Sequence, residues 1–135
     1  MPRIRVLVVD DHDTVRRAIC ALLRSDPDIE VICDVAGGVH AVRKAKELLP
    51  DVIVLDITMP KLDGLKTARR IRKVAPLTEI LFLSQHDSVE SVRQALRAGG
   101  RGYVVKSDAA KELITAVRAV STRKRYVNAK FAADL

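Results

Sequence analysis

Short apolar runs alternate along this chain with longer amphipathic stretches, and this alternation restricts the possible folds more than any other feature. The apolar runs cover residues 3–9, 29–35, 52–55, 80–83 and 103–105. Val, Ile and Leu follow one another in these runs with little polar alternation, which is typical of strands buried on both faces. Between the runs, apolar residues recur every three or four positions, as in Val15, Ile19 and Leu22, which predicts helices.

Five strand–helix units in this order predict an α/β fold with a parallel, doubly wound sheet. We expect the flavodoxin-like (βα)5 arrangement, with the strands in the order 2-1-3-4-5. The units define one domain over residues 3–121. Residues 122–135 show little periodicity, so we expect a linker or tail there.

Length and composition limit the classes of protein that the chain can belong to. With 135 residues and 48% hydrophobic content it can form one domain with a proper core. Its apolar runs are far shorter than the roughly 18 residues that cross a bilayer. The two cysteines, Cys20 and Cys33, suggest no disulfide framework, so we expect a cytoplasmic protein. The net charge is +7, but aromatic residues make up only 3%, which argues against nucleic-acid binding by this chain alone.

Polar residues interrupt the apolar runs mainly at their C-terminal ends. These residues are Asp10, Asp11, Asp56, Ser84 and Lys106. In open α/β sheets, ligands bind outside the carboxyl ends of the strands, where the strand order reverses. In the predicted order the first and third strands are neighbours at that point. Their three aspartates are therefore expected to converge in one pocket.

Three carboxylates in one pocket repel one another unless a positive charge is present. Oxygen ligands of this kind suit Mg²⁺, or Mn²⁺ in its place. Lys106 would supply a fixed cation on the other side, and Ser84 a hydroxyl donor. A metal, a lysine and a hydroxyl around one carboxylate are the groups that phosphoryl transfer to Asp56 would require.

Taken one at a time, these residues have simpler interpretations. A single Asp at a strand end is more often a helix cap than a metal ligand, and we assign Asp13 to capping. His12 and His86 are expected to be solvated, because no second ligand stands at a fitting spacing. The functional interpretation rests on the coincidence of complementary groups at the same ends of four strands.

The residues at these strand ends resemble the receiver domain of response regulators. The matching segments are Val-Val-Asp-Asp-His at 8–12, Asp-Ile-Thr-Met-Pro at 56–60, Asp-Gly at 63–64, Leu-Ser at 83–84 and Gly-Tyr-Val-Val-Lys at 102–106. The resemblance covers residues 3–121. The histidine after the acidic pair and the run at 102–109 are most similar to the NarL/FixJ branch, whose members usually carry a LuxR-type helix-turn-helix domain behind the receiver.

The resemblance implies a role for each matching residue. Asp56 would become the aspartyl phosphate, and Lys106 would contact the phosphoryl oxygens. Asp11, Asp56 and the backbone carbonyl of Thr58 would ligate Mg²⁺, with Asp10 acting through water. Ser84 and Tyr103 would form a switch pair, and Thr58 and His86 would influence the rate of dephosphorylation.

Phosphorylation is expected to shift a conformational equilibrium. It would add about −1.5 to −2 charges at Asp56, drawing Ser84 and Lys106 toward the new oxygens and letting Tyr103 turn inward. Many receivers have a proline after the lysine, joined by a cis bond. Ser107 stands there in this chain, and a cis bond before a non-proline residue costs about 2.5–4 kcal/mol, so we expect none.

The function expected from these observations is phosphoryl acceptance from a sensor histidine kinase and control of an output, most simply transcription. Any chemistry of its own would be slow autophosphorylation and autodephosphorylation, so we do not expect an enzyme. DNA would be bound only through a further C-terminal domain, and a homodimer is left open. One alternative is a stand-alone receiver that acts by protein contact. Another is a phosphohydrolase with an Asp nucleophile, but Thr58 stands where such enzymes carry a second Asp.

Overall fold

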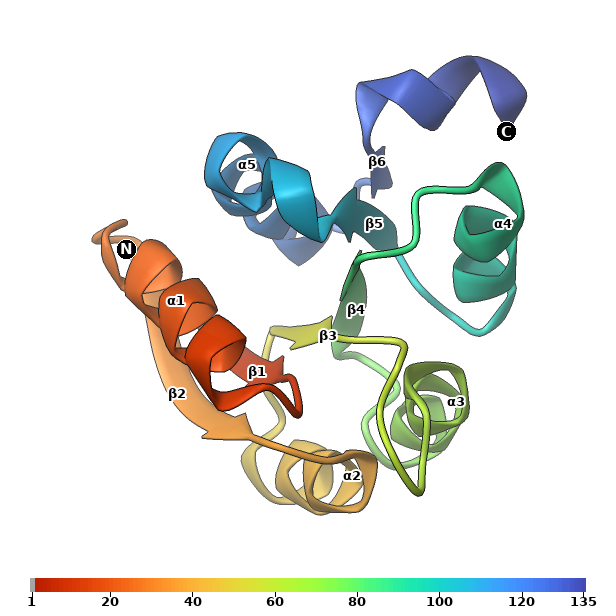
Figure 1. Ribbon diagram of the computed structural model, residues 1–135. Helices are drawn as coiled ribbons and strands as arrows, with labels where there is room; N and C mark the ends of the chain where they lie inside the picture. The colour runs from red at the N-terminus through yellow and green to blue at the C-terminus, as the bar shows by residue number, and fades with distance from the viewer. Residues whose placement is uncertain (1) are drawn as a thin grey trace.

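A six-stranded parallel sheet forms the centre of the computed structural model, which describes residues 2–135 (Figure 1). The strands are β1 (Ile4–Val9), β2 (Ile29–Val35), β3 (Val52–Leu55), β4 (Glu79–Ser84), β5 (Gly102–Val105) and β6 (Tyr126–Val127). Their order is β2-β1-β3-β4-β5-β6. The five predicted strands and their predicted order are therefore confirmed. The prediction missed β6, because two residues are too few to show a period.

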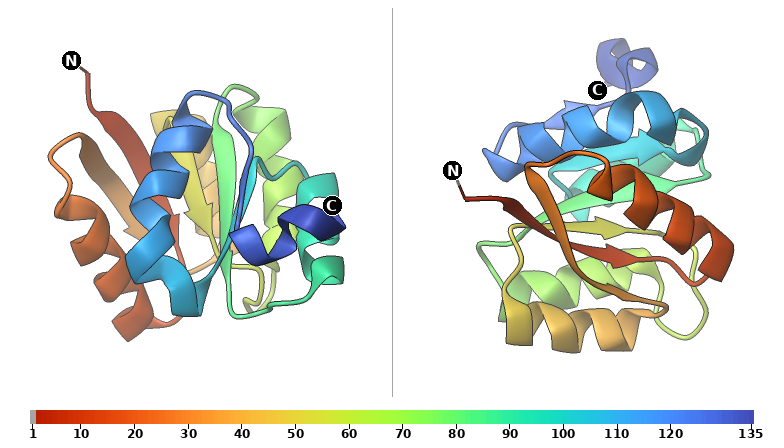
Figure 2. Two further views of the ribbon diagram at one scale, coloured as in Figure 1. Left: turned by 90° about the horizontal axis from the view of Figure 1, so that it is seen from above. Right: turned by 90° about the vertical axis from the view of Figure 1, so that its left-hand side faces the viewer.

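Helices cover both faces of the sheet, as a doubly wound fold requires (Figures 1 and 2). One face carries α1 (Asp13–Arg24) and α5 (Ala109–Ser121). The other carries α2 (Gly38–Leu48), α3 (Gly64–Val74) and α4 (Val89–Arg97). Each face has its own buried apolar cluster, which explains why β3 and β4 are buried along their whole length. Within residues 2–135, no helix is long and apolar enough to cross a membrane.

The pairing of β1 with β3 brings two strand ends together at the point where the strand order reverses. Val9 of β1 is the register partner of Leu55 of β3. The next residues, Asp10 and Asp56, therefore leave the sheet side by side. The Asp56 amide donates to the Val9 carbonyl at 3.0 Å, which ties the two strand ends directly to each other.

Two helix ends show how single residues set the helix bounds. Gly99, just after α4, has a φ of 108°, the left-handed conformation that glycine adopts without strain at a helix end. The assignment of Asp13 to capping is wrong. His12 is the N-cap residue of α1 and makes no side-chain cap hydrogen bond. Asp13 lies inside the first turn instead, where its carboxylate accepts from Arg16 at 2.8 Å.

Residues 122–135 are more ordered than a linker prediction implies. They include β6, which pairs with β5, and a 3₁₀ helix, Ala129–Asp134. Phe131 in this helix is buried against the main body of the domain. The sequence showed no period here because the segment packs through individual residues and not through a continuous face.

Candidate functional site

Three aspartates gather at the carboxyl ends of β1 and β3. Ligand atoms of Asp10, Asp11, His12 and Asp56 all lie within 4.8 Å of one another. Asp10 is 1% exposed and Asp56 3% exposed, so the cluster opens to solvent mainly through Asp11 and His12. The convergence expected from the strand order is thus present in the structure.

Lys106 lies opposite the carboxylates, at the end of β5. Its Nζ is 2.8 Å from Asp10 Oδ2 and 3.4 Å from Asp56 Oδ2. One ammonium group therefore bridges the acidic pair and the predicted phosphoacceptor. The lysine is closer to Asp10 than to Asp56, a difference that sequence reasoning did not predict. The following peptide bond is trans, since the described residues include no cis bond, in agreement with the expectation for Ser107.

Two buried carboxylate oxygens make no hydrogen bond within the described residues. They are Asp10 Oδ2 and Asp11 Oδ1. Asp10 Oδ2 has the nearby Lys106 ammonium as an ion-pair partner, but the two groups are not aligned as a hydrogen bond. Buried polar atoms are rarely left without a partner, and unpaired carboxylate oxygens are the ligands that hard divalent cations prefer. The residues present therefore fit a divalent cation such as Mg²⁺.

The electrostatic environment of Asp56 opposes its ionisation. Burial raises the pKa of the Asp56 carboxyl above its ordinary value of 3.8. The positive charge of Lys106 acts in the opposite direction, and the neighbouring charges of Asp10 and Asp11 reinforce the effect of burial. An ionised Asp56 is thus poorly stabilised by the protein alone. A cation bound between the carboxylates would relieve that cost.

His86 joins the other predicted site residues. Its amide donates to Ser84 Oγ at 3.1 Å, and its Nε2 shares a hydrogen bond with Thr58 Oγ1 at 2.8 Å. Its carbonyl oxygen accepts the Tyr103 hydroxyl at 2.6 Å. The imidazole is exposed, as predicted. The sequence did not indicate that one residue would contact all three of the others.

Tyr103 lies fully inside the protein, with no solvent exposure. Burial raises the pKa of its hydroxyl, so this group stays protonated and donates to the His86 carbonyl. The inward position that we expected to follow phosphorylation is the one that this structure describes.

Sequence reasoning missed the contacts that two residues, His12 and Arg16, make with the acidic pair. His12 Nδ1 lies 3.4 Å from Asp10 Oδ1 and 3.3 Å from Asp11 Oδ1, although His12 is solvent-exposed as predicted. Arg16 donates to the Asp10 carbonyl oxygen at 2.8 Å and to Asp34 on β2 at 2.9 Å. Its place on the first turn of α1, facing the end of β1, is the signal that could have revealed it.

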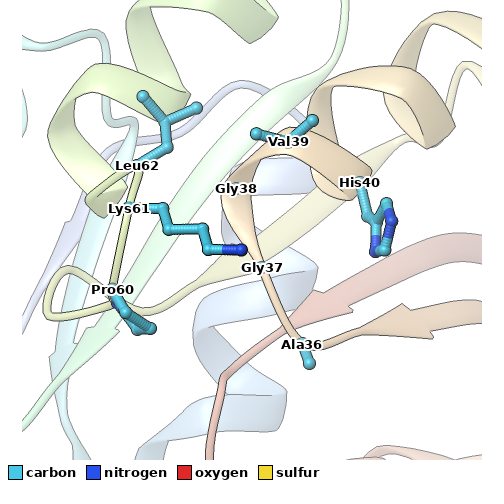
Figure 3. Close-up of a pocket in the computed structure, with 8 residues that line it drawn as sticks. All are labelled: Ala36, Gly37, Gly38, Val39, His40, Pro60, Lys61 and Leu62. Carbon is cyan, nitrogen blue, oxygen red and sulfur yellow. The ribbon is translucent and has the colours of Figure 1, made fainter.

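A pocket of about 410 Å³ lies beside this site but has a different character (Figure 3). It is formed by residues 36–40 and 60–62, at the start of α2 and in the loop after β3. Its lining is mostly apolar and includes no carboxylate. The carboxylate site and the pocket are therefore separate features of the same edge of the sheet.

Gly64 allows α3 to start directly against the backbone of the predicted phosphoacceptor. A Cβ at this position would overlap the Asp56 carbonyl oxygen and approach Ile57 Cα to 2.6 Å. The Gly64 amide also donates to the Ile57 carbonyl at 2.7 Å. The conformation of the loop after β3 thus depends on the absence of a side chain here.

We expect Gly64→Ala to lower the free energy of unfolding by about 1–3 kcal/mol, because the added methyl group must displace backbone atoms. Gly37→Ala is the control, since a Cβ there meets nothing within 4 Å. Gly37 is the N-cap of α2, so this change should cost less than about 1 kcal/mol. Urea unfolding of both variants measures the difference. Equal urea midpoints for the two variants would show that the backbone of Asp56 does not restrict the side chain at position 64.

A parallel doubly wound sheet with carboxylates and a lysine at the strand-order reversal defines a phosphoryl- or metal-handling α/β domain. Comparisons with known proteins narrow this class. Residues 6–118 match the family model described as response regulator receiver domain. The chain belongs to this family.

Similar proteins point to one branch of the family. The chain is 34% identical over 133 residues to the transcriptional regulatory protein DegU of Brevibacillus brevis, covering 98% of this chain and 56% of that protein. It is 40% identical over 118 residues to the response regulator protein VraR of Staphylococcus aureus, covering 87% of this chain and 56% of VraR. It thus spans little more than half the length of these relatives.

Among solved structures, a two-component response regulator of the LuxR family from an Aurantimonas species is similar. Its TM-score is 0.92 at 31% identity, with 97% of this chain and 94% of that chain covered. The resemblance to the NarL/FixJ branch, which contains LuxR-type regulators, is therefore confirmed.

Proposed function

We propose that Asp56 accepts a phosphoryl group from a sensor histidine kinase and that the domain passes this signal to an output. The observation that carries the proposal is the position of the Lys106 ammonium, 2.8 Å from Asp10 and 3.4 Å from Asp56. It lies beside two buried carboxylate oxygens that make no hydrogen bond with residues 2–135. This arrangement places a positive charge where a transferred phosphoryl group would bring negative charge.

In the proposed reaction, an oxygen of Asp56 attacks phosphorus, the new O–P bond forms, and the bond from phosphorus to the donor imidazole breaks. Asp10, Asp11 and Asp56 would hold Mg²⁺, which would neutralise charge on the phosphoryl oxygens. Whether the Thr58 backbone carbonyl completes this ligand set stays a prediction. Lys106 would pair with a phosphoryl oxygen, and the Ser84 hydroxyl would donate to another.

Thr58 and His86 would limit how fast water removes the phosphoryl group. Their side chains are hydrogen-bonded to each other beside Asp56, and neither is a carboxylate. An Asp-nucleophile phosphohydrolase would carry a second Asp at the Thr58 position as its general acid and base, so slow self-catalysed loss is the chemistry that these residues support.

The proposed output is transcription, through a DNA-binding domain outside this chain. The relatives DegU and VraR are longer, and DegU is described as a transcriptional regulatory protein. Phosphorylation would act in the cytoplasm, where the kinase would meet the receiver. A stand-alone receiver that acts by protein contact is the alternative, which the full-length gene sequence would decide.

The test is incubation with Mg²⁺ and a small-molecule phosphodonor, followed by intact mass measurement. We expect the wild type to gain the mass of one phosphoryl group, and Asp56→Asn and wild type in excess chelator to gain none. Phosphorylation of Asp56→Asn to the wild-type extent would refute Asp56 as the acceptor. Continuous rapid release of phosphate would favour the hydrolase.

A further inference from the structure

Residues 126–134, which we call the strap, lie along the edge of the sheet beside β5 and α4 (Figures 1 and 2). β6 runs parallel to β5, with Tyr126 opposite Gly102 and Val127 opposite Tyr103. The 3₁₀ helix that follows reaches α4, where Arg93 donates to the Asp134 carbonyl at 2.8 Å. The strap therefore contacts the same strand that carries Tyr103 and leads into Lys106.

Asn128 anchors the strap to the end of β5. It is 1% exposed, and its Oδ1 accepts from the Val105 amide at 2.8 Å. Its Nδ2 donates to Asp108 and to Glu112. The side chain uses both donors and its acceptor, so it specifies one position of the strap. Val105 immediately precedes Lys106, whose ammonium lies between Asp10 and Asp56.

Phe131 packs against Tyr103, the tyrosine of the predicted switch pair. It is 3% exposed, and its ring meets the Tyr103 ring edge to face, with 6.3 Å between centroids and an interplanar angle of 89°. Such aromatic pairs contribute beyond their buried area. The contact exists only while Tyr103 points inward, because an outward ring would leave this position.

Tyr103 in turn contacts the loop that follows β4. Its hydroxyl donates to the His86 carbonyl at 2.6 Å. The same His86 bonds Ser84 through its amide and Thr58 through its imidazole. Two routes thus join the strap to the Asp56 site. One runs through Phe131 and Tyr103, and the other runs from Asn128 to the Val105 backbone, which leads directly into Lys106.

We propose that docking of the strap and phosphorylation of Asp56 are linked, so that each favours the other. Phe131 favours the inward Tyr103, and Asn128 holds the strand end that presents Lys106 to the phosphoryl group. The linkage rests on the proposed function of Asp56. Because such linkage is reciprocal, phosphorylation would strengthen docking of the strap, and docking of the strap would favour phosphorylation. The chain that follows α5 would then be held on the sheet more firmly in the phosphorylated state.

Hydrogen exchange of the strap tests one direction of this linkage. The amides of Tyr126 and Asn128 are hydrogen-bonded to the Arg101 and Tyr103 carbonyls, so they report docking. We expect a peptide spanning residues 126–134 to exchange about five-fold more slowly after phosphorylation of the 135-residue chain with Mg²⁺ and phosphodonor. Asp56→Asn, treated in the same way, should show no change. Unchanged exchange in a wild-type sample that has gained the phosphoryl mass would refute the linkage but leave the proposed function intact.

Substitutions in the strap test the other direction. Because uptake would proceed from the docked state, Phe131→Ala is expected to slow phosphoryl uptake by the factor that it removes from the docked population, about five-fold. Leu135→Ala removes an exposed apolar side chain directly after the strap and should leave the rate unchanged. A wild-type rate in a folded Phe131→Ala protein would overturn the proposal.

A second variant keeps the test decisive if Phe131→Ala does not fold. Asn128→Asp places a third carboxylate beside Asp108 and Glu112 and removes the amide donors. It should slow uptake to a similar extent, and Glu112→Gln added to it should restore part of the rate by removing one repulsion. Equal rates in wild type, Asn128→Asp and the double variant would overturn the linkage. Failure of the wild type to gain any phosphoryl group would instead refute the proposed function and the linkage together.

Discussion

Replacing Lys106 by methionine is expected to slow phosphoryl uptake by about 10²-fold, as removal of one preorganised charge-stabilising group does in other transfer reactions. The stem of the side chain is preserved, but the ammonium that lies 2.8 Å from Asp10 and 3.4 Å from Asp56 is lost. Its loss also removes the charge that counteracts burial at Asp56, so the pKa of that carboxyl should rise further.

The measurement is the rate of mass gain at fixed concentrations of Mg²⁺ and phosphodonor. Lys111→Met is the matched control, because it makes the same change in net charge at an exposed position on α5. Circular dichroism should show that both variants are folded. A Lys106→Met rate within about three-fold of the control would mean that the ammonium contributes far less than preorganised donors usually do.

The second large effect is a gain in the free energy of unfolding, whereas most substitutions of buried residues lower it. Asp56→Asn should make the metal-free protein more stable at pH 7, by on the order of 1 kcal/mol, or about 4 °C in Tm for a domain of this size. The reason is that burial raises the pKa of Asp56 above 3.8. The native state therefore holds the proton more tightly than the unfolded chain does.

The direction of the pH dependence follows from this difference. A raised carboxyl pKa contributes stability that is fully present below pH 3.8 and is lost as pH rises through the folded-state pKa. The advantage of Asp56→Asn should therefore be small near pH 3.5 and grow toward pH 7. Added Mg²⁺ should stabilise the wild type by binding its native state. The difference in stability between Asp56→Asn and the wild type should therefore become smaller.

Thermal unfolding in chelator and in Mg²⁺, across this pH range, measures both effects. Asp134→Asn is the control, because it makes the same chemical change in an exposed side chain and should leave Tm nearly unchanged. If Asp56→Asn were less stable than wild type at pH 7 in chelator, burial and repulsion would not be the main influences on this carboxyl.

Much of the fold could be predicted because its signals are local. The strands at 29–35 and 52–55 have the predicted bounds. The run at 52–55 is buried throughout, as expected of a strand covered on both faces, whereas 29–35 is an edge strand in which only Ile29 is fully buried. β6 could not be predicted, because its two residues are held by pairing with β5 and have no pattern of their own.

The sequence predicted which residues form the candidate site, but it did not predict which of them contact one another. Asp10, Asp56 and Lys106 all follow buried strands directly, and parallel strands bring such positions to one edge. That Lys106 approaches Asp10 more closely than Asp56 depends on side-chain geometry across the sheet. The contacts of His86 and Arg16 also join segments distant in sequence.

The sequence by itself determined the parallel sheet, the order of its five main strands and the edge at which the charged residues gather. The parallel sheet follows from periodicity, the strand order from the flavodoxin-like arrangement expected of such a chain, and the edge from the geometry that parallel sheets share. Only the tertiary structure decided that Tyr103 is buried beneath Phe131 and that Asn128 fastens residues 126–134 to β5. Such contacts depend on the packing of individual side chains far apart in the chain, which leaves no period in the sequence.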